Sequence, residues 1–185
     1  MAKRKKKKSR ALKSAVSMLK TGVFCLIVLI ATYFIVTYVF RRTVVHNVSM
    51  QETLHDGDNL IMDELTYYVS DPKRFDIICF KSYKEKELLI KRVIGLPGET
   101  VRISDGTIYI NDKEIRDVKG LEPITNSGLA SAGIILDEDE YFVVGDNRLE
   151  SIDSRYEEVG NVNRKDIIGK AVLVYWPLNR IKIIK

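Results

Sequence analysis

Residues 21–40, TGVFCLIVLIATYFIVTYVF, form a run of 20 residues without a charged side chain. At about 1.5 Å per residue, a helix of this length spans roughly 30 Å, the thickness of the hydrocarbon core of a membrane. A cleaved signal peptide would have a shorter apolar region of roughly 7–15 residues and then an A-x-A-like site, whereas RRTVVHN follows here. The run therefore predicts a retained transmembrane anchor that separates a short tail from one further domain.

Charge is distributed unevenly on the two sides of this run. Residues 1–20 hold nine of the 30 Lys and Arg residues and no acidic residue, and positions 41–42 hold two more. That leaves 19 basic against all 25 acidic residues in 43–185, a net charge of −6. By the positive-inside rule we expect a basic cytoplasmic tail at 1–20, a transmembrane anchor at 21–40 and an extracytoplasmic domain at 41–185.

The acidic balance of the domain also limits its partners. Binding of nucleic acid needs a basic surface that faces the phosphates, and here the basic residues are concentrated in the tail. We therefore expect a lipid bilayer as a partner, and no nucleic acid. The protein is expected in the cell membrane as a single-pass chain.

Beyond the anchor, short β-like runs alternate with turn residues. VRIS, DG, TIYI and ND predict successive hairpins across 101–113, because Asp-Gly supplies the positive φ of a two-residue loop. Four longer runs predict further strands: FDIICF (75–80), ELLIKRVIG (87–95), YFVVGD (141–146) and DIIGKAVLVYW (166–176). The less patterned stretch 116–136 is expected to be a loop or excursion. We predict a mainly β domain, an antiparallel sheet or barrel-like fold, behind a single N-terminal transmembrane helix.

The two cysteines indicate neither a disulfide nor a metal site. Cys25 lies within the apolar run, and Cys79 lies in a predicted strand of the domain that follows it. The chain has no CxxC motif and no His/Cys cluster. Both are expected to be small hydrophobic residues. We expect no metal and no cofactor.

A serine lies shortly after the anchor, in HNVSMQETLHDGD at 46–58. Ser49 follows Phe40 by nine residues, a reach of about 30 Å at most, which confines it near the membrane surface. As a nucleophile it would need a base, because a serine hydroxyl is unreactive at neutral pH. His46 and His55 flank it, but a histidine near a turn is more often a surface residue. A polar turn serine remains the alternative.

A lysine in ELLIKRVIGLPGE could supply the base instead. A free lysine, with a pKa of about 10.4, is protonated at pH 7, whereas burial in an apolar setting lowers the pKa by up to several units. Strand alternation places Lys91 on the same face as Leu89 and Val93, with Arg92 on the other face. The pattern alone nevertheless favours a lysine at a sheet edge that reaches to water.

The stretch VVGDNRLESIDSRYEEVG at 143–160 is dense in polar side chains. The ordinary interpretation is a polar loop that satisfies its own backbone through capping side chains. The alternative is a braced site, in which Arg155 makes a bidentate ion pair with Asp153 or Asp146.

Together these three stretches resemble the bacterial type I signal peptidases, membrane-anchored serine proteases that use a Ser–Lys dyad. Ser49 begins SMQETL, which matches the family pattern S-M-x-P-T-L except that Glu52 replaces the proline. KRVIGLPGE is unbroken from Lys91 to Glu99, and the pattern G-D-N-R-x-x-S-x-D-S-R is complete from Gly145 to Arg155. The order of the motifs and the anchor also match, so the resemblance covers essentially the whole chain.

The resemblance implies a serine endopeptidase that removes N-terminal signal peptides from secreted preproteins after small residues of the Ala-x-Ala type. It implies Ser49 as nucleophile, Lys91 as neutral general base and Ser151 as the residue that orients the lysine. It also implies supporting positions: a salt bridge of Asp153 with Arg155, a wall of Gly145, Asp146 and Asn147, and Met50 packed beside the nucleophile.

Two positions depart from the family pattern. Glu52 in place of proline is expected to loosen the backbone after the nucleophile. Asn47 stands two residues before Ser49, where the family often has Ser or Gly, and some members use a hydroxyl there beside the nucleophile's own backbone N–H in the oxyanion hole. As a hypothesis, the Asn47 amide is the second donor to the oxyanion.

Other protein classes share some of these features. The main alternative is a non-catalytic signal-peptidase-like assembly factor for surface proteins, but such a protein is expected to have lost the serine or the lysine. Self-cleaving repressors use Ser–Lys chemistry but should carry a DNA-binding N-terminal domain. A sortase-like transpeptidase needs a reactive cysteine, and Cys79 lies in an apolar strand.

Overall fold

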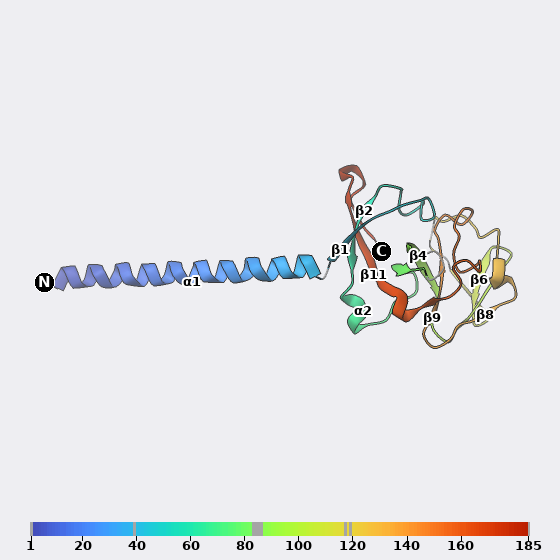
Figure 1. The fold of residues 1–185 in the computed structure, drawn as a ribbon, viewed down its shortest axis with the longest axis horizontal. Coiled ribbons are helices and arrows are strands. Elements are labelled where there is room, and N and C mark those ends of the chain that lie inside the picture. Colours follow the sequence, from blue (N-terminus) through green and yellow to red (C-terminus); the bar gives the residue numbers. More distant parts are fainter. Residues whose placement is uncertain (1, 39, 83–86, 117, 119, 185) are drawn as a thin grey trace. The chain divides into compact units, whose positions relative to one another are not determined.

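The computed structural model describes residues 2–38, 40–82, 87–116, 118 and 120–184. The chain divides into two compact units, Met1–Val39 and Phe40–Lys185. The first unit contains helix α1 (Ala2–Tyr38), and its segment Lys13–Tyr33 is long and apolar enough to cross a membrane, with a mean hydropathy of 2.1. The predicted N-terminal apolar helix is therefore present (Figure 1).

The second unit is built mainly from short strands. Its elements in chain order are β1 (Phe40–Val44), β2 (Asn59–Asp63), α2 (Thr66–Val69), β3 (Ile77–Lys81), β4 (Leu88–Gly95), β5 (Thr100–Ser104), β6 (Thr107–Ile110), β7 (Lys113–Ile115), η1 (Gly128–Ser131), β8 (Ile134–Ile135), β9 (Glu140–Val144), β10 (Val162–Asn163), η2 (Arg164–Asp166), β11 (Ile167–Trp176), η3 (Leu178–Arg180) and β12 (Lys182–Ile183).

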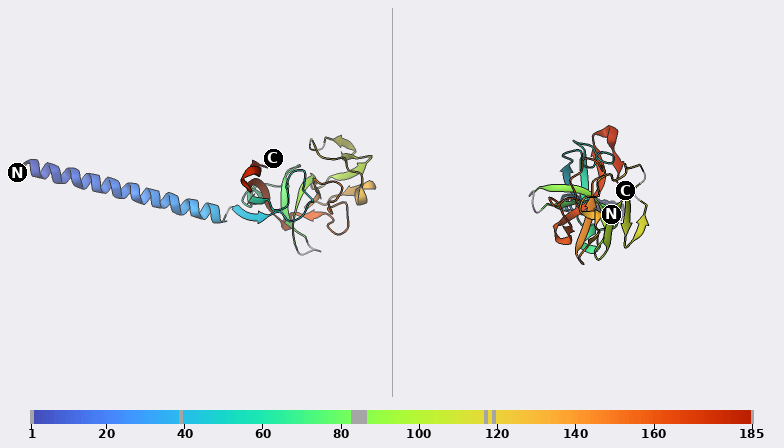
Figure 2. Two further views of the ribbon diagram at one scale, coloured as in Figure 1. Left: turned by 90° about the horizontal axis from the view of Figure 1, so that it is seen from above. Right: turned by 90° about the vertical axis from the view of Figure 1, so that its right-hand side faces the viewer.

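These strands form two sheets in which every described pairing is antiparallel. The larger sheet has the order β1-β2-β11-β3-β4-β9-β10, with β12 paired to β11, and the smaller sheet has the order β7-β6-β5-β8. Within the second unit, β1 and the smaller sheet lie at opposite ends (Figures 1 and 2). The prediction of a mainly β, antiparallel fold is confirmed.

Both predicted types of hairpin are present. β5 and β6 pair around Asp105 and Gly106, whose φ angles of 51° and 80° are the positive values that a two-residue loop requires. Asn111 and Asp112 do the same between β6 and β7. β3 pairs with β4 over its whole length, although residues 83–86 between them lie outside the described part.

The stretch 116–136 contributes to the smaller sheet, apart from residues 117 and 119, which are not described. Its β8 pairs with β5, and Ile124, Ala130 and Leu136 are buried in the core that the smaller sheet shares with β9. This part of the chain lacks a regular period because single apolar residues from turns, rather than a strand face, enter the core.

Strand β9 is buried on both faces and joins two cores. Phe142 and Val144 face the core shared with the smaller sheet, and Tyr141 and Val143 face a second core formed with β3 and β4. Such a strand reads as a continuous apolar run because neither face meets water. The polar segment after β9 is therefore attached to a strand that is held from both faces.

A third core packs Met50 and Leu54 against β2, β3 and β11, as part of the cluster Val45, Met50, Leu54, Leu60, Ile77, Ala171, Val174 and Ile184.

Cys79 provides a test of the core around β3. The side chain is 1% exposed, and its burial raises the pKa of the thiol to about 12 from 9.0. We expect a Cys25→Ser variant in detergent to react with iodoacetamide at pH 8.5 at least about 100-fold more slowly when folded than in guanidinium, because the thiolate is the reactive species. Alkylation of the folded protein at the denatured rate would contradict this burial.

The raised pKa of Cys79 also determines how the free energy of unfolding changes with pH. The unfolded chain loses the Cys79 proton first, because its pKa is the lower one. The thiol's contribution to the free energy of unfolding is therefore complete below pH 9 and falls as the pH rises from about 9 to about 12.

Candidate active site

Ser49 lies in a tight turn that follows β1. The backbone N–H groups of Thr53 and Leu54 both donate to the carbonyl of Met50, at 2.8 and 2.6 Å. Met50 and Leu54 are 1% and 0% exposed, so the turn is fixed to the third core by two apolar side chains. Ser49, next to Met50, stays only half-buried and can be reached from solvent. The turn is closed in this way although Glu52 replaces a proline.

Lys91 lies in the middle of β4, opposite Ile78 of β3. It is 2% exposed, and its neighbours on the same face, Leu89 and Val93, belong to the second core. Its Nζ donates to Ser151 Oγ at 3.1 Å. The alternative of a lysine that reaches to water at a sheet edge is therefore wrong.

The chain after β9 brings this lysine near the Ser49 turn. β4 and β9 pair with Arg92 opposite Val144. Lys91 precedes Arg92 in β4, and Gly145 follows Val144 directly after the end of β9. A Cβ atom at Gly145 would lie under 3.0 Å from both Ser151 Oγ and the carbonyl oxygen of Ser49. Ser49 and the Lys91–Ser151 pair therefore meet at one glycine.

The residues after Gly145 hold the Ser49 turn directly, and we name residues 145–147 the clamp. Asn147 donates its backbone N–H to the Ser49 carbonyl and its Nδ2 to the Val48 carbonyl, each at 3.1 Å. The Asp146 N–H donates to Met50 Sδ at 3.4 Å. The clamp fixes the main chain on both sides of Ser49.

A buried ion pair supports the clamp on the opposite face of β4. Arg92 Nε and Nη2 donate to the two carboxylate oxygens of Asp146 at 2.8 and 2.6 Å, and the two side chains are 2% and 0% exposed. The same carboxylate accepts the hydroxyl of Thr53, which lies in the Ser49 turn. Strand, clamp and turn thus share one charge pair. The sequence placed Arg92 on this face but gave no signal that it binds Asp146.

A second buried ion pair organises the residues around Ser151. Arg155 Nε and Nη2 donate to the two oxygens of Asp153 at 2.8 and 2.9 Å. Asp153 Oδ2 also accepts the Gly145 N–H at 2.9 Å, and Arg155 Nη2 donates to the Ser151 carbonyl at 3.2 Å. Of the two partners considered for Arg155, Asp153 is the one it binds. The arrangement is more than a self-capping loop, because it reaches the glycine that touches Ser49.

Asn47 adopts an unusual backbone conformation beside the Ser49 turn. Its φ is 86°, in the left-handed region, and its N–H donates to Asp56 Oδ1 at 3.0 Å. Its side-chain Oδ1 accepts the Ser49 N–H at 3.1 Å. In this arrangement the Asn47 amide accepts a hydrogen bond at Ser49, whereas the hypothesis from sequence gave it the role of a donor.

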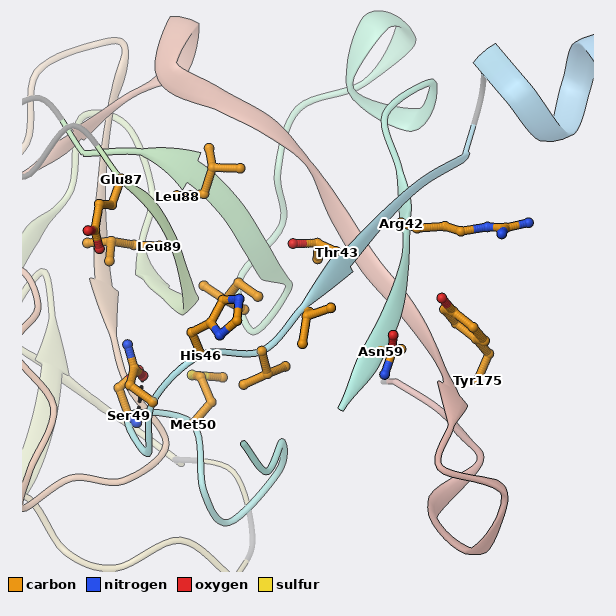
Figure 3. Close-up of a pocket in the computed structure, with 14 residues that line it drawn as sticks. Arg42, Thr43, His46, Ser49, Met50, Asn59, Glu87, Leu88, Leu89 and Tyr175 are labelled. Atoms are coloured by element: carbon orange, nitrogen blue, oxygen red, sulfur yellow. Dashed lines mark hydrogen bonds between the residues drawn. The ribbon is translucent and has the colours of Figure 1, made fainter. Parts of the chain in front are cut away.

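A groove of about 670 Å³ opens beside Ser49. Figure 3 shows Thr43 and His46, from β1 and the segment after it, facing Glu87, just before β4, and Leu88 and Leu89 at the start of β4. Ser49 and Met50 also line the groove. The cavity is the size of a small-molecule or peptide side-chain site.

The histidines occupy different places around this groove. His46 is exposed and lines the groove. His55 is also exposed but lies outside the groove, and its backbone N–H donates to Asp58 Oδ2 at 2.9 Å. Within the described ranges, no three His, Cys, Asp or Glu residues gather closely enough to hold a metal ion.

The crowding at Gly145 can be tested by stability alone. Gly145 does not have a positive φ, so an added methyl group acts through space rather than through backbone strain. We expect Gly145→Ala to lower the free energy of unfolding by about 1–3 kcal/mol, because Ser151 or the Ser49 carbonyl must move. Urea denaturation of the detergent-solubilised chain measures this.

The matched control is Gly22→Ala, where the added methyl group meets nothing within 4 Å and φ is not positive. It should not lower the free energy of unfolding, because alanine favours a helix interior such as that of α1 more than glycine does. Equal effects of the two substitutions would contradict the crowding at Gly145, because they would show that a methyl group fits there without displacing its neighbours.

This chain is similar over most of its length to known protein sequences. A family model described as signal peptidase, peptidase S26, matches residues 18–176. Signal peptidase I P of Bacillus subtilis subsp. natto is 35% identical over 164 residues, which cover 85% of this chain and 88% of that protein. Signal peptidase I T of Bacillus subtilis (strain 168) is 32% identical over 179 residues, which cover 93% and 92%. A crystal structure of a signal peptidase I from Enterococcus faecalis V583 matches 55% of this chain and 97% of its own, with 37% identity and a TM-score of 0.46.

The family model spans well over half of the chain, and both Bacillus relatives align over most of their length. The resemblance predicted from the three motifs is confirmed, and so is the prediction of an enzyme of the signal peptidase I type. Removal of signal peptides from preproteins is the activity of that family, and its members are membrane-associated. This chain belongs to the signal peptidase family, peptidase S26.

Proposed function

We propose that this chain cleaves signal peptides by a Ser–Lys mechanism. Ser49 Oγ attacks the scissile carbonyl carbon while Lys91, as a neutral amine, takes the hydroxyl proton. The C–O bond forms as the carbonyl π electrons move to oxygen. Collapse of this intermediate breaks the C–N bond, and the leaving amine receives the proton from Lys91. Water then hydrolyses the Ser49 ester by the same steps, releasing the signal peptide.

The observation that carries this proposal is the burial of Lys91 beside the Ser49 turn. The lysine is 2% exposed, lies on a face with Leu89 and Val93, and donates to Ser151 Oγ at 3.1 Å. Burial penalises a charged ammonium, so it favours the neutral amine that a general base must be. Both histidines are exposed, and neither has this setting.

Ser151 acts in this mechanism as a positioning residue. Its hydroxyl contacts Lys91 Nζ, and its backbone carbonyl accepts from Arg155, which is itself fixed by Asp153. A long lysine side chain has many rotamers, and a fixed partner reduces the entropy lost when it reaches the reacting geometry. The clamp has the same role for Ser49.

The groove suits a preprotein bound as an extended strand. Among the described pairings, β9 covers β4 only from Arg92 onwards, and β3 is the one strand paired with Leu88, Leu89 and Ile90. On the other side of the groove, β1 pairs only with β2 in the described part of the chain. Free backbone groups on two facing strands can receive a peptide by strand addition.

An extended substrate would also explain a preference for small residues. Alternate side chains of a strand point to the same side, so the first and third residues before the scissile bond would face the groove floor together. Apolar side chains of Val44, Leu89 and Ile90 contribute to the lining there. We propose the Ala-x-Ala preference of this enzyme on that basis.

We also propose that α1 anchors the enzyme as a single-pass protein. The segment Lys13–Tyr33 has the length and composition of a membrane span, and the lysines and arginines of residues 1–20 favour a cytoplasmic N-terminus. The catalytic unit would then lie outside the cytoplasm, where a translocated preprotein still held by its own apolar segment presents its cleavage site.

Substitution of the two central residues tests the mechanism. We expect Ser49→Ala and Lys91→Met each to abolish cleavage of a preprotein with alanine at positions −3 and −1, because one removes the nucleophile and the other the base. Gel analysis of the detergent-solubilised enzyme with the preprotein measures the product. Circular dichroism should show an intact fold in both variants.

The matched control is Lys113→Met, an exposed lysine in strand β7. It should cleave at the wild-type rate. Retained cleavage by Lys91→Met would refute the dyad, and absence of cleavage by the wild type would favour a non-catalytic assembly role.

A further inference from the structure

The backbone N–H of Ser49 has a hydrogen-bond acceptor within the chain itself. In serine proteases the nucleophile's own N–H commonly stabilises the oxyanion that forms on the scissile carbonyl. Here that N–H donates to Asn47 Oδ1 at 3.1 Å. A substrate oxygen can accept a hydrogen bond from this N–H only after its bond to Asn47 Oδ1 has broken.

The identity of the Asn47 atom follows from hydrogen-bond chemistry. The amide side chain has one acceptor and one donor end, and a backbone N–H can bond only to the acceptor. The atom next to Ser49 is therefore the oxygen, and Nδ2 is turned away from the Ser49 N–H.

The main chain of Asn47 is held in place while its side chain has room to turn. The φ of 86° and the bond of its N–H to Asp56 fix the backbone. The residue is exposed and lines the groove beside Ser49. A rotation of about 180° about the Cβ–Cγ bond exchanges Oδ1 and Nδ2 without moving the backbone.

We propose that Asn47 is a catalytic residue that works as a two-position gate of the oxyanion hole. In the resting position Oδ1 occupies the Ser49 N–H, and in the reacting position Nδ2 and the Ser49 N–H both donate to the substrate oxyanion. The inference rests on the proposed nucleophilic role of Ser49. The second donor faces the oxygen only after the rotation. Its hydrogen bond therefore stabilises the transition state and not the bound substrate, and it raises kcat without lowering KM.

Three substitutions separate the two halves of the gate. Asn47→Asp keeps the shape and the acceptor but has no donor to present. Asn47→Gly removes acceptor and donor, and glycine tolerates the positive φ. Asn47→Ser keeps a hydroxyl that can donate. The order of kcat expected is wild type, then Ser, then Gly, with Asp lowest.

The measurement is steady-state kinetics on a peptide that spans an Ala-x-Ala cleavage site. We expect Asn47→Asp to lower kcat by about 10²–10³-fold, the usual loss for an oxyanion donor, with KM within about threefold of wild type. Asn47→Gly should retain a higher kcat than Asn47→Asp, because it also removes the oxygen that blocks the Ser49 N–H.

Asn111 offers a matched control far from the groove in sequence. It too has a positive φ, 49°, and its Oδ1 accepts a backbone N–H, that of Thr100 at 2.9 Å. If such an asparagine only shapes a turn, Asn111→Asp and Asn47→Asp should behave alike. We expect Asn111→Asp to leave kcat at the wild-type value.

The outcomes are distinct from those that test the dyad. A wild-type kcat in Asn47→Asp would overturn the gate while leaving Ser49 and Lys91 in their roles. A kcat of Asn47→Ser no higher than that of Asn47→Gly would overturn the donor half. If the Asp variant does not fold by circular dichroism, the comparison of Ser with Gly still decides.

Discussion

The contact between the clamp and the Ser49 turn is the interaction on which the candidate site depends. These segments lie almost a hundred residues apart in sequence, and the hydrogen bonds of Asn147 to the Val48 and Ser49 carbonyls join them. Gly145 permits the approach, because any side chain there would collide with Ser49 and Ser151. Without this contact the Ser49 turn and the Lys91–Ser151 pair would not lie on either side of one glycine.

Two buried ion pairs keep the clamp in position, and both have a cost. Desolvation of a charge pair often offsets its attraction, so such pairs are weak sources of stability, but loss of one partner leaves an uncompensated charge and costs several kcal/mol. The Arg92–Asp146 and Arg155–Asp153 pairs each use both carboxylate oxygens and further backbone or hydroxyl partners. Their value here is geometric, since each connects a strand or loop to the glycine at the centre.

Much of the architecture could be predicted from local pattern. The long alternating or apolar runs became β3, β4, β9 and β11, and the Asp-Gly pair became a hairpin loop. Strands β1, β2, β8, β10 and β12 were missed. β8, β10 and β12 have two residues each, too few to show a period, and β1 (FRRTV) and β2 (NLIMD) mix charged or polar with apolar residues in a short run. They are strands only because a distant partner supplies their hydrogen bonds.

The candidate site was predictable in its residues but not in its contacts. Three motifs singled out Ser49, Lys91 and the run from Gly145 to Arg155, whereas the alternation around Lys91 was equally compatible with an exposed lysine. Burial of that lysine depends on packing across β9, which no local window contains. The partner of Arg92 and the orientation of the Asn47 amide were likewise inaccessible, since both depend on which atoms the folded chain brings together.

The most direct measurement of the central claim is the position of the covalent intermediate. A slowly hydrolysed peptide ester is mixed with the enzyme, the reaction is quenched in acid within the first turnover, and the digest is mapped by mass spectrometry. A Ser49–Lys91 dyad predicts one acyl group, attached to Ser49, and none when Lys91 is replaced by methionine. An acyl group on Ser151 or Cys79, or on Ser49 at an unchanged rate without Lys91, would contradict it.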